Sequence, residues 1–389
     1  MQPHKNLTIL MTGLLSTLLP ACNSPSSNSL SNGSAAEPAP VVDHKTGFSS
    51  QKIARFNEPW AMTFLPDGRL LVTEKNGQLK LHDFNTRKTG NISGVPQVAY
   101  GGQGGLGDVV LHPDFDQNGL IYLSYAESGA GGKGAAVARA KLVLDDKGDG
   151  QLSGIQVIWR QVPKVSGEGH FGHRIAFDPQ GMLWISSGER QKFDPAQDMS
   201  TNLGKIIRLK DDGSIPADNP FVNQGGVAAQ VWSLGHRNPL GLAFNAQGQL
   251  WEIEMGPKGG DELNLIEKAQ NYGYPLVSNG VHYDGKPIPN HSTRPEFKAP
   301  AISWTPVISP SSLIFYTGSQ FPAWENNALV GGLSSQALIR LEFDGNRARE
   351  AERFDMGARI REVEQGPNGA VWVLEDGPNA NLLQLVPNK

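Results

Sequence analysis

The chain has 389 residues and a formal net charge of −4, with 34 basic and 38 acidic side chains. This near-balance gives no reason to expect a nucleic acid or an acidic membrane surface as a partner. Its 46 glycines and 27 prolines disfavour a helical bundle, and its single cysteine excludes a disulfide within one chain. Since 38% of the residues are hydrophobic, the chain can build a substantial core. These values favour one large all-β domain.

Residues 1–22 are typical of an export signal. Lys5 precedes an apolar run of 13 residues, Leu7 to Leu19, which is too short to span a bilayer comfortably. The run ends in Leu-Pro-Ala-Cys22, which resembles the lipobox of bacterial lipoproteins, where the cysteine is acylated and becomes the first residue. The alternative is an ordinary cleaved signal with an incidental cysteine. Asn23 after the cysteine favours the outer membrane, so we expect export to the periplasmic side of the envelope and a lipid at Cys22 as the only membrane contact.

Residues 23–45 are rich in Ser, Asn, Ala and Pro and contain too few apolar side chains to fold. Such a segment is expected to be a flexible tether with an end-to-end distance of about 25 Å. It would separate a folded domain, residues 46–389, from a membrane.

A hairpin pattern recurs along this domain: an apolar segment, a polar turn with glycine, and a second apolar segment. The copies cover residues 60–74, 107–124, 174–186, 239–251 and 361–374, with a weaker copy at 312–333. Their turn glycines are Gly68, Gly119, Gly181, Gly248 and Gly369. One hairpin cannot bury its faces alone, whereas radial repetition can. The pattern predicts a six-bladed β-propeller of four-stranded antiparallel blades; a β-sandwich is the alternative, but it needs no repeat near 60 residues.

Functional residues of propellers gather on the loops that join successive blades, at one end of the channel. Gln103 lies among glycines at residues 100–107, which allow close approach to a ligand, although a bare turn is the alternative. Residues 167–174 contain two histidines and an arginine. Among them, His170 suits a general base because its unperturbed pKa is near neutrality; a structural histidine is the alternative.

Two further segments carry charge. Residues 255–264 combine carboxylates with turn carbonyls, the hard oxygen ligands that calcium takes, or form a solvated acidic turn. Arg359 and Arg361 lie two residues apart on a predicted strand and therefore share a face. They need an anionic partner if that face lines the channel, and they form an exposed charged edge if it does not.

In combination these motifs resemble those of the soluble PQQ-dependent aldose sugar dehydrogenases, the glucose/sorbosone dehydrogenase family. The motifs are Gly-His-Arg-Asn-Pro-Leu-Gly-Leu at 235–242, Gly-Pro with Asp-Glu-Leu-Asn-Leu-Ile at 256–266, Asn-Tyr-Gly-Tyr-Pro at 271–275 and Arg-Ile-Arg-Glu-Val at 359–363. The resemblance covers residues 56–386 in order. It implies oxidation of an aldose at the anomeric carbon to the lactone, with pyrroloquinoline quinone (PQQ) and Ca²⁺ as cofactors and an external electron acceptor.

The resemblance also implies roles for residues in catalysis. His170 would take the proton of the anomeric hydroxyl while hydride leaves C1 for the quinone. Gln103 would lie beside the reacting carbonyl, and Glu189 would orient His170. Arg237 would contact the quinone oxygens.

The implied cofactor site holds Gln103, Arg237, Asn238, Trp304, Arg359, Arg361 and Asp376. Within it, Trp304 would cover the ring and Asp376 would form the far wall. Arg359 and Arg361 would bind cofactor carboxylates, for which the guanidinium fork is suited.

Calcium would act as a Lewis acid on the quinone carbonyl. The resemblance implies that the carbonyls of Gly256 and Pro257 hold this ion, and that Asp261 and Tyr272 hold a second, structural calcium.

Two residues depart from the family pattern. Met255 stands where relatives commonly have Gln or His, so the second calcium site loses a hard ligand. Ser334 stands where some members place a lysine on the cofactor, which predicts weaker cofactor binding. Two other functions stay open: a calcium-dependent propeller lactonase, which would not need the paired arginines, and a non-catalytic surface-binding propeller.

Overall fold

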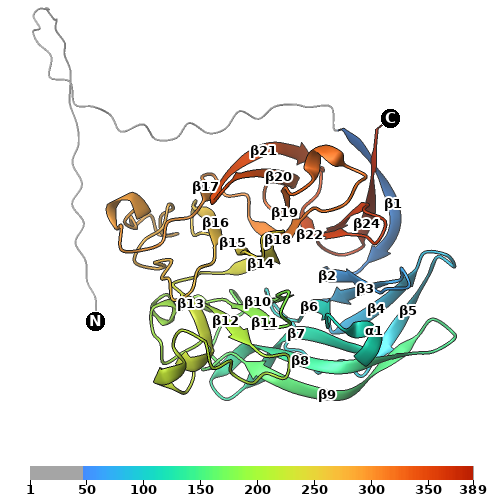
Figure 1. Ribbon diagram of the computed structural model, residues 1–389, viewed down its shortest axis with the longest axis horizontal. Coiled ribbons are helices and arrows are strands. Elements are labelled where there is room, and N and C mark those ends of the chain that lie inside the picture. Colours follow the sequence, from blue (N-terminus) through green and yellow to red (C-terminus); the bar gives the residue numbers. More distant parts are fainter. Residues whose placement is uncertain (1–46, 389) are drawn as a thin grey trace, which may run out of the picture. The chain divides into compact units, whose positions relative to one another are not determined.

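The computed structural model describes residues 47–388 (Figure 1). The predicted signal, tether and Cys22 lie outside the described residues. Between residues 47 and 388 there are 24 strands, one α-helix of four residues, α1 (Phe115–Asn118), and five 3₁₀ turns. The turns are Asp194–Ala196, Val222–Gln224, Ala228–Gln230, His291–Thr293 and Pro322–Trp324. The prediction of an all-β domain is confirmed, and no helix in this range is long and apolar enough to cross a membrane.

Three sheets are antiparallel meanders of four consecutive strands. The first contains β10 (Gly172–Phe177), β11 (Leu183–Ser187), β12 (Lys205–Leu209) and β13 (Val231–Leu234). The second contains β14 (Pro239–Phe244), β15 (Leu250–Glu254), β16 (Asp261–Leu265) and β17 (Ile302–Trp304). The third contains β18 (Pro310–Phe315), β19 (Ala328–Gly332), β20 (Ala337–Asp344) and β21 (Arg347–Asp355).

A fourth four-stranded sheet joins the two ends of the described chain. It contains β22 (Ile360–Gln365), β23 (Val371–Glu375), β24 (Ala380–Pro387) and, from the N-terminal end, β1 (Phe48–Phe56). β1 pairs antiparallel with β24 from Phe48 opposite Pro387 to Phe56 opposite Ala380. Because the first strand completes the last sheet, the domain closes on itself without a covalent link.

The remaining eight strands form one sheet rather than two. They are β2 (Pro59–Phe64), β3 (Leu70–Glu74), β4 (Gln78–Asp83), β5 (Lys88–Ser93), β6 (Leu106–Leu111), β7 (Leu120–Gly129), β8 (Gly132–Leu144) and β9 (Gly150–Arg160). Their order is β2-β3-β4-β5-β9-β8-β7-β6. Two antiparallel meanders are joined by a parallel pairing of β5 with β9, limited to Ile92 with Gly150 and Ser93 with Gln151. The expectation of six separate four-stranded sheets is therefore not confirmed.

The six predicted hairpins are present. Each joins the first two strands of one meander, and each of the five predicted turn glycines has a positive φ, from 65° at Gly119 to 87° at Gly68. The weaker copy corresponds to β18 and β19, whose connection contains the 3₁₀ turn Pro322–Trp324. A glycine is required at these turns because a side chain disfavours the left-handed region.

The first strands of the meanders lie nearest to a common centre, in the order β2, β6, β10, β14, β18 and β22 (Figure 1). Each contacts the next, and β22 contacts β2. Apolar side chains fill the space between neighbouring meanders; Leu263 of β16 and Val330 of β19, for example, share one buried cluster.

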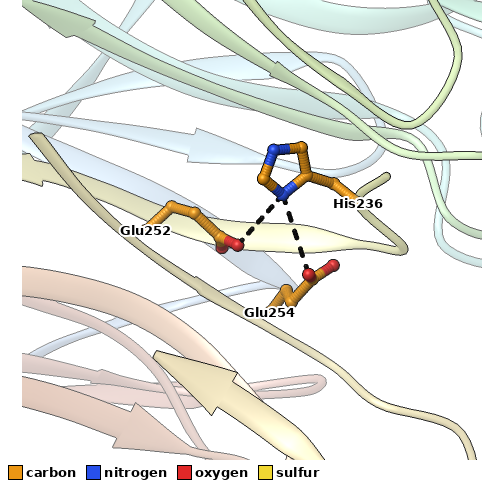
Figure 2. A group of neighbouring side chains, drawn as sticks. All are labelled: His236, Glu252 and Glu254. Atoms are coloured by element: carbon orange, nitrogen blue, oxygen red, sulfur yellow. Dashed lines mark ion pairs between the residues drawn. The ribbon is translucent and has the colours of Figure 1, made fainter. Parts of the chain in front are cut away.

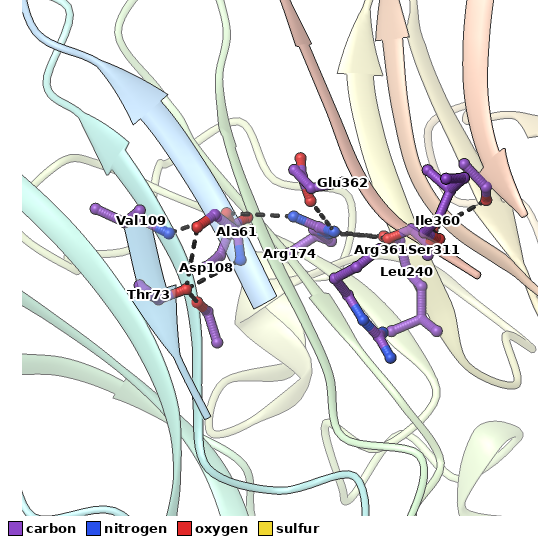
Figure 3. Close-up of polar contacts among 12 residues, drawn as sticks. Ala61, Thr73, Asp108, Val109, Arg174, Leu240, Ser311, Ile360, Arg361 and Glu362 are labelled. Carbon is purple, nitrogen blue, oxygen red and sulfur yellow. Dashed lines mark hydrogen bonds and ion pairs between the residues drawn. The ribbon is translucent and has the colours of Figure 1, made fainter. Parts of the chain in front are cut away.

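The guanidinium of Arg174 contacts each of the other five of these strands, and Figure 3 shows it beside Asp108, Glu362, Leu240 and Ser311. Arg174 on β10 donates to the carbonyls of Leu240 on β14 at 2.7 Å and Ser311 on β18 at 2.6 Å. It pairs with Asp108 on β6 at 3.4 Å and with Glu362 on β22 at 2.5 Å. Its Cζ lies 4.1 Å from the ring centroid of Trp60 on β2. Removing this cation would leave two buried carboxylates uncompensated, a loss that costs about 3–5 kcal/mol in buried ion pairs.

Candidate active site

A cavity of about 400 Å³ adjoins this network, and Trp60 forms part of its wall. The predicted residues that line it are Gln103, Asn238, Met255, Arg359, Arg361 and Asp376. Trp60, Lys75 and His173 also line it and were not singled out from the sequence. A larger cavity of about 670 Å³, at Phe64, Phe84 and Trp372, contains none of the predicted residues. The first cavity therefore gathers five of the seven residues predicted to bind the cofactor, but neither His170 nor Arg237.

The walls of this cavity carry an excess of positive charge. Nε of Arg359 donates to Asp376 at 2.8 Å, and Nε and Nη2 of Arg361 donate to the same carboxylate at 2.9 and 2.8 Å. Burial raises the pKa of Asp376, but the two arginines outweigh this and keep it below its ordinary value. Lys75 also lines the cavity; it donates to the Gly102 carbonyl at 3.0 Å and lies 3.8 Å from the carboxylate of Glu58, so three cations face two carboxylates here. Because one carboxylate serves two arginines, their side that faces the cavity suits an anionic ligand.

Two hydrogen bonds, one to its side chain and one to its backbone, fix the position of His170. Its Nδ1 is hydrogen-bonded to the buried carboxylate of Glu189, and its backbone N–H donates to Oε1 of Gln103 at 2.7 Å. Burial lowers the pKa of His170, the bond with Glu189 raises it, and the net shift is below its ordinary value. The ring is therefore neutral at pH 7, with a proton on Nδ1 for Glu189 and a free lone pair on Nε2, which is the state that a general base requires.

The loops around His170 have an unusual backbone. His170, Arg190, Gln191 and Phe193 have φ between 51° and 64°, a region that costs energy for residues other than glycine. Arg190 supports the His170 loop by donating to the carbonyls of Gly169 at 2.5 Å and Gly167 at 2.8 Å. Arg190 was not predicted from the sequence, because no local pattern indicates that its side chain contacts this loop.

Glu254 fixes the position of the Arg237–Asn238 segment. Its Oε2 accepts the backbone N–H of Arg237 at 2.5 Å and of Asn238 at 3.0 Å. The carbonyl of Arg237 accepts the backbone N–H of Glu189 at 2.9 Å. Nη1 of Arg237 donates to the carbonyls of Met255 at 2.8 Å and Gly256 at 2.6 Å. The predicted catalytic arginine thus contacts one of the carbonyls predicted for calcium.

A second cavity, of about 440 Å³, is lined by His170 and Arg237. Glu189 and Pro257 line it, together with the aromatic residues Phe193, Tyr274, His282 and Tyr283. Phe193 stacks near Tyr274, with ring centroids 6.3 Å apart, and meets His282 edge to face at 5.8 Å. The arrangement offers flat apolar faces beside a neutral imidazole.

A family model described as Glucose / Sorbosone dehydrogenase matches residues 56–384. The chain belongs to the glucose/sorbosone dehydrogenase family. It is 40% identical over 342 residues to the aldose sugar dehydrogenase YliI of Escherichia coli, covering 86% of this chain and 91% of that protein. The resemblance stated from the motifs is confirmed, and the family is one of oxidoreductases.

Solved structures of family members share this fold. The soluble aldose sugar dehydrogenase of Escherichia coli in its apo form has a TM-score of 0.82 at 38% identity, covering 88% of this chain and 100% of that one. The PQQ-bound aldose sugar dehydrogenase of Streptomyces coelicolor has a TM-score of 0.72 at 27% identity, covering 87% and 98%.

Some residues that the family resemblance placed in the site lie elsewhere. Trp304 is on β17, the outermost strand of its sheet, where its indole packs in a buried cluster and donates to Glu350 at 2.7 Å. It does not line the cavity; the indole that does is Trp60. Ser334 is exposed, and its hydroxyl donates to the Val307 carbonyl at 3.3 Å. Gly102 lines the cavity and also makes room for the loop that contains Glu168, because a Cβ at residue 102 would lie 2.6 Å from that of Glu168.

Asp261 and Tyr272, which were predicted to hold a second calcium, are hydrogen-bonded to the surrounding backbone. The carboxylate of Asp261 accepts the backbone N–H groups of Gly256 at 2.8 Å and of Ile308 and Ser309 at 2.7 Å each. Burial raises the pKa of Asp261 to about 6. The Tyr272 hydroxyl donates to the Leu265 carbonyl at 2.5 Å. These bonds brace the turn that contains Gly256 and Pro257.

Proposed function

We propose that this protein oxidises aldoses at the anomeric carbon to the lactone, with PQQ and calcium as cofactors and an external electron acceptor. The observation that carries the proposal is the Glu189–His170–Gln103 arrangement, in which Gln103 lines the cavity with the arginines and His170 and Glu189 line the aromatic cavity. The PQQ bound to the Streptomyces coelicolor relative supports the choice of cofactor.

His170 is the proposed base. Glu189 fixes its proton on Nδ1, so Nε2 accepts the proton of the anomeric hydroxyl while the C1 hydrogen leaves as hydride. The positive charge that forms on the imidazole is stabilised by the adjacent carboxylate, as in other His–carboxylate pairs. Lowering of the His170 pKa keeps the ring unprotonated before the reaction at neutral pH.

The residues present fit a planar polyanion. Arg359, Arg361 and Lys75 supply cations around the 400 Å³ cavity, and Trp60 supplies an aromatic wall. Arg359 and Arg361 would bind the carboxylates of PQQ, while Gln103 and Asn238 would donate to its oxygens. When bound, the quinone supplies the hydride acceptor, and calcium supplies a Lewis acid beside it.

For calcium, the fit is to one site. The carbonyl of Gly256 accepts from Nη1 of Arg237 at 2.6 Å, and its second lone pair could accept an ion. Gly256 and Pro257 are therefore the proposed ligands. A second, structural calcium at Asp261 and Tyr272 stays a prediction from the family resemblance.

The aldose is proposed to occupy the aromatic cavity. Phe193, Tyr274 and Tyr283 offer faces for the apolar C–H surface of a sugar ring. From there the anomeric hydroxyl would reach His170, which lines this cavity.

We further propose that the eight-stranded sheet represents two blades, which makes the fold a six-bladed propeller of four-stranded blades. Six hairpins, six innermost strands in a closed order and a β5–β9 pairing of only two residue pairs support this interpretation.

The expectation of a lipid at Cys22 and of an outer-membrane location on the periplasmic side stands as a proposal from the sequence. Labelling of growing cells with a radioactive fatty acid tests it: we expect label on the parent protein and none on Cys22→Ser. An unlabelled parent protein would refute the anchor.

Reconstitution of the purified protein tests the activity. The protein is stripped of metal and mixed with PQQ, CaCl₂, a panel of aldoses and an electron-accepting dye. We expect dye reduction that requires both additions and that is abolished in His170→Ala, while PQQ binding persists because the base acts in the transition state. Hydrolysis of lactones without PQQ would instead favour the lactonase, although Arg174 already compensates the central carboxylates Asp108 and Glu362.

A further inference from the structure

Three buried side chains next to the candidate active site form a separate cluster (Figure 2). Glu252 and Glu254 lie two residues apart on β15 and therefore share a face, and His236 precedes the Arg237–Asn238 segment. Their exposed fractions are 0% for His236 and Glu252 and 3% for Glu254. Nδ1 of His236 lies 3.3 Å from Oε1 of Glu252 and 3.7 Å from Oε1 of Glu254.

Several atoms of this cluster have no hydrogen-bond partner within the described residues. They are Nδ1 of His236, Oε2 of Glu252 and Oδ1 of the neighbouring Asn264, all buried. Figure 2 shows the imidazole nitrogen directed at both carboxylates. Buried polar atoms are nearly always paired, so three unpaired ones at one place indicate a missing partner.

The ring of His236 is held in the orientation that a ligand requires. Its Nε2 is hydrogen-bonded to the hydroxyl of Ser233 at 2.8 Å. The ring of Tyr272 stacks on it, with centroids 4.6 Å apart and planes 28° from parallel. Such a second hydrogen bond is the usual way in which proteins fix the free nitrogen of a metal-binding histidine.

The spacing of the three ligand atoms fits a small cation. Tetrahedral coordination with metal–ligand bonds of about 2.0–2.1 Å places neighbouring ligand atoms about 3.3–3.4 Å apart. The two observed separations from Nδ1 are 3.3 and 3.7 Å, and all three atoms lie within 4.8 Å of one another. Calcium takes six to eight oxygen ligands at longer distances, which this set does not supply.

The charges also balance. Two carboxylates and a neutral imidazole carry −2, which a divalent cation neutralises, and a buried site needs this neutrality.

We propose that His236, Glu252 and Glu254 form a binding site for one divalent transition-metal ion with the coordination preference of Zn²⁺. The site is distinct from the proposed cofactor calcium and does not depend on the proposed activity. It has a structural consequence: the ion would fix Oε1 of Glu254, while Oε2 of the same residue holds the backbone of Arg237 and Asn238.

Metal analysis of the purified protein tests the site. The protein is stripped with a chelator, incubated with ZnCl₂ and passed over a desalting column. We expect one zinc per chain in the parent protein and at least about tenfold weaker binding in His236→Ala and in the isosteric Glu252→Gln. His291→Gln is the matched control, because His291 forms the other buried His–Glu pair of this sheet, with Glu262 at 3.3 Å. It should retain the zinc.

X-ray absorption of the zinc-loaded parent protein tests the ligands without a variant, so it still applies if a variant does not fold. We expect one imidazole nitrogen and at least two carboxylate oxygens at about 2.0–2.1 Å. No zinc retained by the parent protein, equal retention in Glu252→Gln, or a first shell with more than one imidazole would overturn the proposal.

Discussion

Replacing Glu189 by glutamine tests how the proton on His170 is placed. In the structure, Oε2 of Glu189 accepts the backbone N–H groups of Lys192 at 2.5 Å and Phe193 at 2.7 Å, while Oε1 bonds to Nδ1 of His170. A glutamine has one oxygen and one NH₂ group, so it cannot accept on both sides. Its oxygen is expected to stay with the two backbone donors, and its NH₂ group then faces the imidazole.

This change forces the opposite tautomer on His170. Nδ1 becomes the acceptor and the proton moves to Nε2, the atom proposed to take the proton of the sugar. A positioned base contributes about 10²–10⁴-fold, and a carboxylate-to-amide change of this kind removes it. We therefore expect kcat of Glu189→Gln to fall by about 10²–10⁴, which equals about 2.7–5.4 kcal/mol in the barrier.

The assay is dye reduction by the reconstituted enzyme at saturating PQQ and aldose, with PQQ affinity measured separately. Glu168→Gln is the control, because Glu168 lies on the same loop as His170 but is exposed and pairs with Lys133. The control should keep kcat, and both variants should bind PQQ as the parent protein does. A kcat of Glu189→Gln within about threefold of the parent protein would refute the role of Glu189 in setting the tautomer.

Three further predictions concern the cofactor, stability and substrate. Arg359→Ala removes a charge-assisted bond to a cofactor carboxylate and should weaken PQQ binding about 10- to 100-fold in a titration, with kcat at saturating PQQ unchanged; unaltered affinity would contradict its role. Burial, together with Arg174, lowers the pKa of His173 to about 3. Between pH 6.5 and 3, therefore, the imidazole is protonated in the unfolded chain but not in the folded one, so the free energy of unfolding decreases as the pH falls. From pH 7 to 4.5 this amounts to about 2.7 kcal/mol, and urea unfolding of His173→Gln should show a correspondingly flatter pH dependence; an equal slope would argue against it. Phe193→Ala should raise KM for the aldose about tenfold with a smaller change in kcat, and an unchanged KM would move the sugar out of the aromatic cavity.

The sequence by itself determined the class of the fold and predicted most of the residues that line the two cavities of the candidate site. A hairpin is a local structure, and a glycine such as Gly68 is required where its backbone has φ of 87°, so the repeat predicts the hairpins without knowledge of their neighbours. The distinctive motifs lie on the loops before these hairpins, so Gln103, His170, Arg237 and Asn238 were identified as a set. The structure brings them together because the first strands of the hairpins surround one centre.

Only the tertiary structure decided which distant residues meet. Three features depend on chain segments that no local pattern connects: the pairing of β1 with β24, the joining of β5 to β9, and the contact of Arg174 with the other five inner strands. The same holds for the aromatic wall of the cavity. Trp60 and Trp304 both lie next to glycine-rich or proline-rich turns, so the local sequence does not distinguish them. The position of its strand in the sheet determines that Trp60 faces the centre and that Trp304 faces the core. The cluster of His236 with Glu252 and Glu254 was likewise not predicted. A histidine in a loop and two glutamates on a strand can bind one ion together only when packing brings them into contact and removes the water between them.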